Sequence, residues 1–165
     1  MFFISFHEVF STMNPSNSAD HLVLMDLIFE NKLREMMQLV PNLSTLNFIS
    51  VPTSSPLTLA VGTAEEEVIE YLLLRGADPN FADAQTLPLI AAIERSVEAD
   101  KYWADNGLEE GGRENPMAII ELLLLYGADF TKKDPSGESA YEFAIKVHHP
   151  STRLFESLMQ EPKGD

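Results

Sequence analysis

The chain has no cysteine and few basic residues, and both shortages narrow the functions open to it. Without cysteine there is no disulfide framework, no thiolate metal site and no cysteine nucleophile. Eleven Lys and Arg residues stand against 26 Asp and Glu residues, for a formal net charge of −15. This charge repels phosphate backbones and anionic lipids, so nucleic acid and membranes are poor partners, whereas a basic protein would be attracted. Acidity also keeps a chain in solution, so by itself it does not demonstrate a partner.

Long apolar runs are missing too. No stretch reaches the roughly 18 apolar residues of a membrane span. The N-terminal stretch MFFISFHEVFSTM is apolar, but the first basic residue is Lys32, so a secretory signal with a positive start is not expected. Residues 1–17 are expected to be either disordered or a short helix against the domain, and Met13 is an alternative native start. Together these features favour a cytoplasmic protein.

Motifs that carry chemistry are equally absent. The chain has no Gly-x-Ser-x-Gly, no phosphate-binding glycine loop and no His-Glu-x-x-His. His148 and His149 are adjacent, whereas two metal ligands on one helix are separated by three or four residues, so we expect a solvated turn there. The run of acids at residues 65–67 is expected to be a solvated helix start. We therefore predict no catalytic site, no cofactor and no metal.

What the chain does contain is a repeat. EYLLLRGADPN at residues 70–80 returns as ELLLLYGADFT at residues 121–131. Upstream, SPLTLAV at 55–61 is followed by LPLIAAI at 87–93 and by SAYEFAI at 139–145. The spacing indicates a unit of about 33 residues, and one copy carries about 18 extra residues.

Each unit predicts two helices. Ser55 before Pro56 is a helix start, because serine caps free N–H groups and proline is tolerated at the first helical position. Residues 63–66, Thr-Ala-Glu-Glu, match a capping box for a second helix. Gly76 is placed to end that helix in the left-handed conformation, after which residues 78–80 turn the chain outward.

Residues 55–80 resemble the ankyrin repeat nearly position for position, and residues 134–141 match the opening of another copy. The resemblance implies an all-α ankyrin-repeat solenoid of four helix pairs with finger loops. The expected repeats cover about 18–50, 51–83, 84–134 and 135–160, and residues 161–165 form a tail. The first is degenerate, with Pro41-Asn42 in place of Gly-Ala-Asp. The side chains expected to be buried are Leu57, Leu72, Leu73, Leu89, Ala92, Leu122, Leu123, Phe143 and Leu158.

An insertion over about residues 96–115 interrupts the third repeat. Residues 96–105 contain no helix breaker and should lengthen the preceding helix, and Asn106-Gly107 should end it. The insertion carries the only tryptophan, Trp103, beside Tyr102. Aromatic side chains beside charges are typical of interface anchors, although Trp103 could instead pack the lengthened helix onto its neighbour.

The resemblance implies a protein–protein interaction module that binds through its fingers and concave face, and not an enzyme. With the negative charge, we expect a monomeric inhibitor, or an immunity or antitoxin-like protein, that neutralises a basic partner such as a toxin or effector. An ankyrin scaffold or adaptor that binds without inhibiting is the alternative. The expected partner-binding residues are Tyr102, Trp103, Asp105, Glu109, Glu110, Phe81, Asp83, Gln85, Lys132, Lys133 and Asp134.

Overall fold

The computed structural model describes residues 15–50, 54–107 and 117–160, and within them the chain is helical. The helices form four consecutive pairs. The first two pairs are α1 (Pro15–Phe29) with α2 (Leu33–Leu39), and α3 (Pro56–Thr63) with α4 (Glu66–Leu74). The last two pairs are α5 (Pro88–Asn106) with α6 (Ala118–Leu125), and α7 (Ala140–Lys146) with α8 (Ser151–Gln160). A short 3-10 helix, η1 (Val40–Asn42), follows α2.

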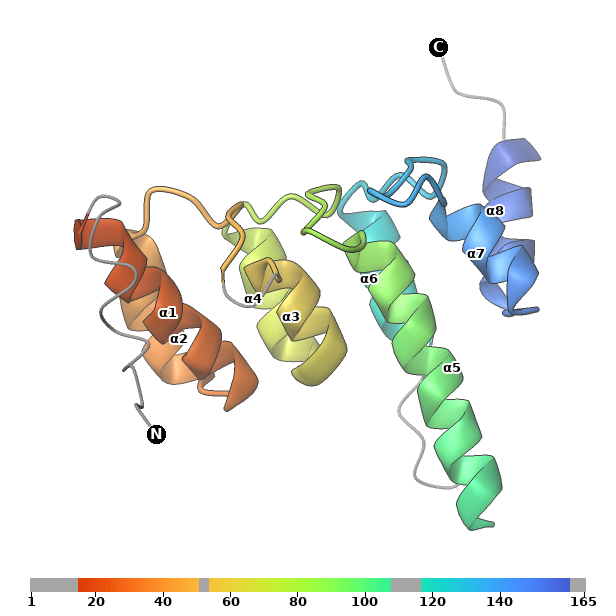
Figure 1. Ribbon diagram of the computed structural model, residues 1–165, viewed down its shortest axis with the longest axis horizontal. Coiled ribbons are helices and arrows are strands. Elements are labelled where there is room, and N and C mark those ends of the chain that lie inside the picture. The colour runs from red at the N-terminus through yellow and green to blue at the C-terminus, as the bar shows by residue number, and fades with distance from the viewer. Residues whose placement is uncertain (1–14, 51–53, 108–116, 161–165) are drawn as a thin grey trace, which may run out of the picture.

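The pairs stand side by side in a row, and the loops that join them run along one edge (Figure 1). The first helices of the pairs pack in succession, α1 on α3, α3 on α5 and α5 on α7, and α4 packs on α6 behind them. The described residues contain no β-strand, only an isolated bridge between Lys133 and Ser139. The predicted all-α solenoid is therefore confirmed.

Helix starts follow the sequence signals in part. The Ser55 side chain accepts a hydrogen bond from the Thr58 N–H at 3.1 Å, as expected for a cap in front of Pro56. The predicted capping box at residues 63–66 is wrong, because the Thr63 hydroxyl instead donates to the Leu59 carbonyl at 2.8 Å. The N–H of Glu65 donates to the Asn31 side chain of the preceding pair, at 3.0 Å.

Glycines end the helices as predicted. Gly76 has φ of 93° and Gly127 has φ of 88°, both in the left-handed region. In each case the next residue closes the helix by the same bond: the Ala77 N–H donates to Leu72 at 3.0 Å, and the Ala128 N–H donates to Leu123 at 2.9 Å. The two Gly-Ala-Asp sequences therefore form the same kind of helix C-cap.

The core runs through the row of pairs, and seven of the nine side chains expected in it are buried. The two exceptions lie in the last pair, whose outer side no further helix among the described residues covers. Phe143 is only half-buried, and Leu158 is 36% exposed near the end of α8. In their place, Phe155 of α8 is completely buried and stacks on Phe130, with ring centroids 4.9 Å apart.

The third pair departs from the others as predicted. Helix α5 has 19 residues and α3 has 8, which correspond to about 28 Å and about 12 Å of helix. Gly107, with φ of 60°, ends α5. Arg95 fastens α5 to its neighbour, because its guanidinium donates to the Val61 and Ala64 carbonyls at the end of α3, at 2.9 and 2.8 Å.

The expected solvated turn at His148 and His149 is half right. His148 is exposed with φ of 56°, but His149 is only 4% exposed. Its ring hydrogen-bonds to the Ser96 hydroxyl of α5 at 2.9 Å and to the Ser151 hydroxyl at 2.8 Å. Burial lowers the pKa of His149 below its ordinary value. His149 thus joins the third and fourth pairs, which no local pattern indicated.

Candidate partner-binding surface

The finger loops are held to one another by asparagine side chains. The Asn47 side chain accepts a hydrogen bond from the Asp78 N–H at 2.8 Å. One repeat later, the Asn80 side chain accepts from the Asp129 N–H at 2.7 Å and donates to the Gly127 carbonyl at 2.8 Å. An asparagine of one finger thus fixes the Gly-Ala-Asp turn of the next finger in both cases, so the fingers form a pre-ordered edge.

The second finger presents only some of its expected binding residues. Asp83 is 5% exposed, and its carboxylate accepts from the Gln85 and Thr86 N–H groups, each at 2.8 Å. Its role is therefore to shape the turn. Gln85 is exposed and Phe81 half-buried, so these two side chains remain accessible at this finger.

The charged side chains of the third finger form hydrogen bonds and an ion pair within the chain. Lys132 donates to the Asn80 carbonyl at 2.7 Å, and Lys133 forms an ion pair with Glu142. Asp134 accepts from the Ser136 N–H at 2.8 Å. The ion pair with Lys133, together with hydrogen bonds from Ser139, lowers the pKa of Glu142 to about 2. These lysines are exposed, but they already have partners within the chain.

A group of carboxylates lies between the second and third fingers. Glu94 of α5 has its pKa raised, first by partial burial and then by repulsion from Glu98, Asp134, Asp83 and Glu138. Glu94 and Glu98 are exposed and form no ion pair within the described residues. We call Glu94, Glu98, Asp134 and Glu138 the acidic patch. The other three carboxylates are close enough to Glu94 to disfavour its charged form, and an approaching cation would relieve this repulsion.

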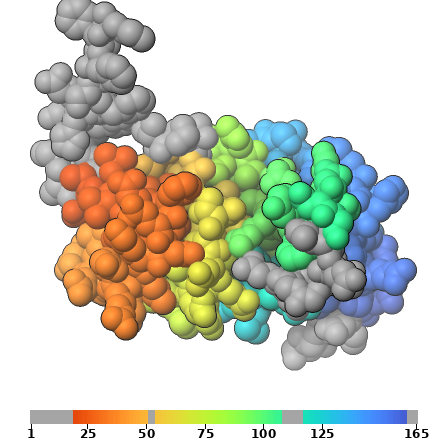
Figure 2. Space-filling view, turned by 90° about the horizontal axis from the view of Figure 1, so that it is seen from below, coloured from red at the N-terminus to blue at the C-terminus, as the bar shows by residue number. Residues whose placement is uncertain are grey.

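The aromatic residues of the insertion lie elsewhere. Tyr102 is 60% exposed and Trp103 is half-buried, and both lie near the distal end of α5. About 22 Å of helix separates Trp103 from Pro88, where α5 leaves the fingers. Figure 1 shows this end of α5 reaching beyond the other helices, on the side opposite to the loops. Figure 2, seen from below, shows its green atoms on the visible face.

The expected binding residues therefore fall into two groups. Phe81, Gln85 and the third finger lie at one end of α5, whereas Tyr102, Trp103 and the exposed Asp105 lie at the other. Glu109 and Glu110 lie outside the described residues. The sequence pointed to neither the two separate locations nor the role of Glu94 and Glu98, although their spacing of four residues on a helix is visible in it.

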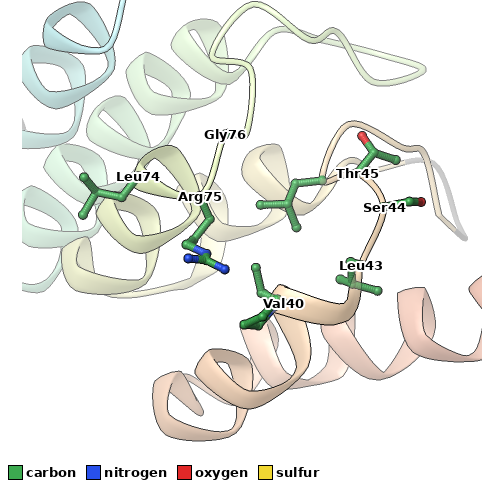
Figure 3. Close-up of a pocket in the computed structure, with 9 residues that line it drawn as sticks. Val40, Leu43, Ser44, Thr45, Leu74, Arg75 and Gly76 are labelled. Atoms are coloured by element: carbon green, nitrogen blue, oxygen red, sulfur yellow. The ribbon is translucent and has the colours of Figure 1, made fainter.

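Two pockets open on other parts of the surface. One, of about 490 Å³, lies between the first two pairs and is lined by Val40, Leu43, Leu74 and Arg75 among others (Figure 3). It forms where η1 and the loop after it replace the glycine-ended turn of the later pairs. The other, of about 630 Å³, lies beside α7 and α8. Within the described residues no three His, Asp or Glu side chains group as metal ligands do, and no helix is long and apolar enough to cross a membrane.

Comparison with known proteins agrees with the repeat architecture. The family model for the ankyrin repeat matches residues 54–84, which contain the second helix pair. NF-kappa-B inhibitor alpha from Sus scrofa is 27% identical to the chain over 144 residues, covering 73% of this chain and 46% of that protein. The Homo sapiens protein of the same name is also 27% identical over 144 residues, with 73% and 45% coverage. The chain thus spans a little under half the length of these curated relatives.

Proposed function

Because the chain is an ankyrin-repeat protein, a protein-interaction module, we propose that it binds one partner protein and inhibits it without catalysis. The relatives are named as inhibitors of NF-kappa-B, so the proposed partner is a protein of the NF-kappa-B class. A toxin as partner, expected from the repeat resemblance together with charge and size, has no counterpart among these relatives. The chain is therefore proposed to be an inhibitor, as the sequence suggested, but of a protein of the NF-kappa-B class and not of a toxin.

The acidic patch is the observation that carries the proposed mode of binding. Its carboxylates lie beside the fingers, on the part of the stack where α5 packs on α7. Bringing a Lys- or Arg-rich surface against them would remove their mutual repulsion, and the complementary charge would speed encounter. We therefore propose that the partner offers a basic surface, and that covering this surface blocks its activity.

The fingers give this surface its shape. Their asparagine-linked turns hold Phe81 and Gln85 beside the patch before any partner arrives. A pre-ordered edge loses little conformational entropy on binding, which favours affinity. The distal end of α5 provides a second contact for a partner large enough to extend along the helix by about 22 Å.

The test is competition with a known relative. The purified chain is titrated against human NF-kappa-B, with human NF-kappa-B inhibitor alpha as the positive control and as competitor. We expect direct binding, displacement by the competitor, and loss of the activity that the control suppresses in the same assay. Binding without loss of activity would identify an adaptor instead, and no binding would refute the proposed partner.

Charge reversal then locates the surface. The double variant Glu94→Lys/Glu98→Lys should weaken binding and reduce its dependence on salt, because it removes the uncompensated acids. The matched control is Glu66→Lys/Glu70→Lys, which makes the same change of charge at exposed positions four residues apart on α4. Equal weakening by both variants would show that overall charge matters and that the acidic patch does not.

A further inference from the structure

Within the part of the chain that the structure describes, the first helix pair leaves apolar side chains uncovered. Helix α1 buries Leu24 and Ile28 against its neighbours, yet on its other sides Leu22, Val23 and Phe29 are 37%, 48% and 68% exposed. Met37 of α2 and Ile49 in the following loop are also more than half exposed. Asp26 is also exposed on this helix, but neighbouring apolar side chains at the surface commonly mark a face that another element covers. We call Leu22, Val23 and Phe29 the end face.

The opposite end of the stack is built differently. Helix α8 buries Phe155 and presents Arg153, Glu156 and Ser157 to solvent, beside Leu158 and Met159, which are 36% and 47% exposed. This is the arrangement that a repeat stack needs at its ends, because a terminal repeat has one side without a neighbour. On α1 the exposed side chains between residues 22 and 29 are mainly apolar, with Asp26 as the polar one among them, so this end of the stack is the more apolar of the two and is suited to a covering element.

A covering element of matching chemistry is joined directly to α1. Residues 1–13 contain apolar side chains at Phe2, Phe3, Phe6, Val9 and Phe10, and no Lys or Arg. Thirteen residues span about 20 Å as a helix and about 43 Å when extended. Helix α1 has 15 residues, about 22 Å, so an extended segment can run back along its whole length and a helical segment along nearly all of it.

We propose that residues 1–13 dock on the end face and cap the stack. These residues lie outside the described part of the chain, so the proposal rests on the exposed apolar side chains of α1, on the more polar outer side of α8, and on the composition and length of the attached segment. The cap would prevent a second copy from stacking on the first pair, and it would leave the acidic patch free. It does not depend on the identity of any partner.

The absence of cysteine gives a clean test by disulfide cross-linking in the full chain. One variant carries Phe3→Cys with Phe29→Cys. The matched control carries Phe3→Cys with Leu125→Cys, because Leu125 is 80% exposed on α6, away from the end face. After mild oxidation, mass spectrometry should find an intramolecular disulfide in most of the first variant and in little of the control.

Other outcomes would overturn the proposal. Equal cross-linking in both variants would mean that the segment samples the surface without docking, and a disulfide between two chains would assign the end face to a second copy. An independent measurement uses Phe6→Ser/Phe10→Ser and Phe29→Ser. The first change should lower the melting temperature in the native background but have little further effect once Phe29 is replaced. Fully additive shifts would contradict docking on this face.

Discussion

Replacing His149 should change how the stability of the protein depends on pH. The Ser151 N–H donates to Nδ1 of His149 at 3.2 Å, so Nδ1 is an acceptor and Nε2 carries the proton that is donated to Ser96. Protonation would remove that acceptor at the start of α8 and place a charge on a ring that is 4% exposed. The neutral form is therefore the one that the fold requires.

The sign and size of the effect follow from linkage. Burial lowers the pKa of His149 in the folded state from an ordinary value of 6.5. The stabilisation is thus fully present above pH 6.5 and is lost as the pH falls through the lower folded pKa, because the unfolded chain takes up the proton first. The loss reaches at most about 1.4 kcal/mol for each pH unit in that window.

The assay is urea unfolding followed by circular dichroism at pH 7.5 and at pH 5.5. His149→Gln should be less stable than the native chain at pH 7.5, because it disturbs the bonds to Ser96 and Ser151, but the difference should shrink at pH 5.5, by at most about 1.4 kcal/mol. His148→Asn, at the exposed neighbour, should keep the native pH dependence. His21 has a pKa lowered by burial too, and it is present in all three proteins. A difference between His149→Gln and the native chain that is the same at both pH values would refute this reasoning.

Four further changes test the fold and the surface. Leu123→Ala removes a fully buried side chain and should cost about 2–5 kcal/mol in urea unfolding. Gly76→Val should destabilise by about 1–2 kcal/mol more than Gly62→Val, because both sites have open space for a side chain but only Gly76 has positive φ; equal shifts in melting temperature would contradict this. Asn80→Ala should cost about 1 kcal/mol by releasing the third finger, and hydrogen exchange should rise there. Trp103→Ala should leave the melting temperature nearly unchanged and speed dissociation of the partner. If Trp103 is an anchor, the binding free energy should weaken by about 2 kcal/mol.

The parts of the fold that were predictable from sequence depend on residues close together in the chain. Ser55 caps a helix that begins one residue later, and Gly76 and Gly127 end helices through bonds to residues within five positions. The length of α5 followed from the absence of a breaker before Asn106. Signals of this kind lie within a single turn or helix, so the sequence of one repeat displays them.

The parts that were missed depend on contacts between neighbouring repeats. In front of α4, the Asn31 side chain and not Thr63 accepts a hydrogen bond, and its donor is the N–H of Glu65, 34 positions later in the chain. Ser96 meets His149 across 53 positions, which turned an expected solvated turn into a buried one. Such pairs are set by how the helix pairs stack, and one sequence carries no local pattern for them.

The same limit applies to charge. Composition established an excess of acidic residues. Which acidic side chains remain without an ion pair depends on where the few Lys and Arg side chains lie in the fold. Around α7, Lys133 pairs with Glu142 and Lys146 pairs with Glu138 at 3.1 Å, so these acids are partly neutralised. Glu94 and Glu98 on α5 have no such pair in the described part of the chain, and repulsion from nearby carboxylates contributes to the raised pKa of Glu94. Exposed acids lie on α4 as well, at Glu66 and Glu70, so what distinguishes α5 is its position: the proposed basic partner would meet Glu94 and Glu98 with the fingers on one side and the distal end of α5 on the other.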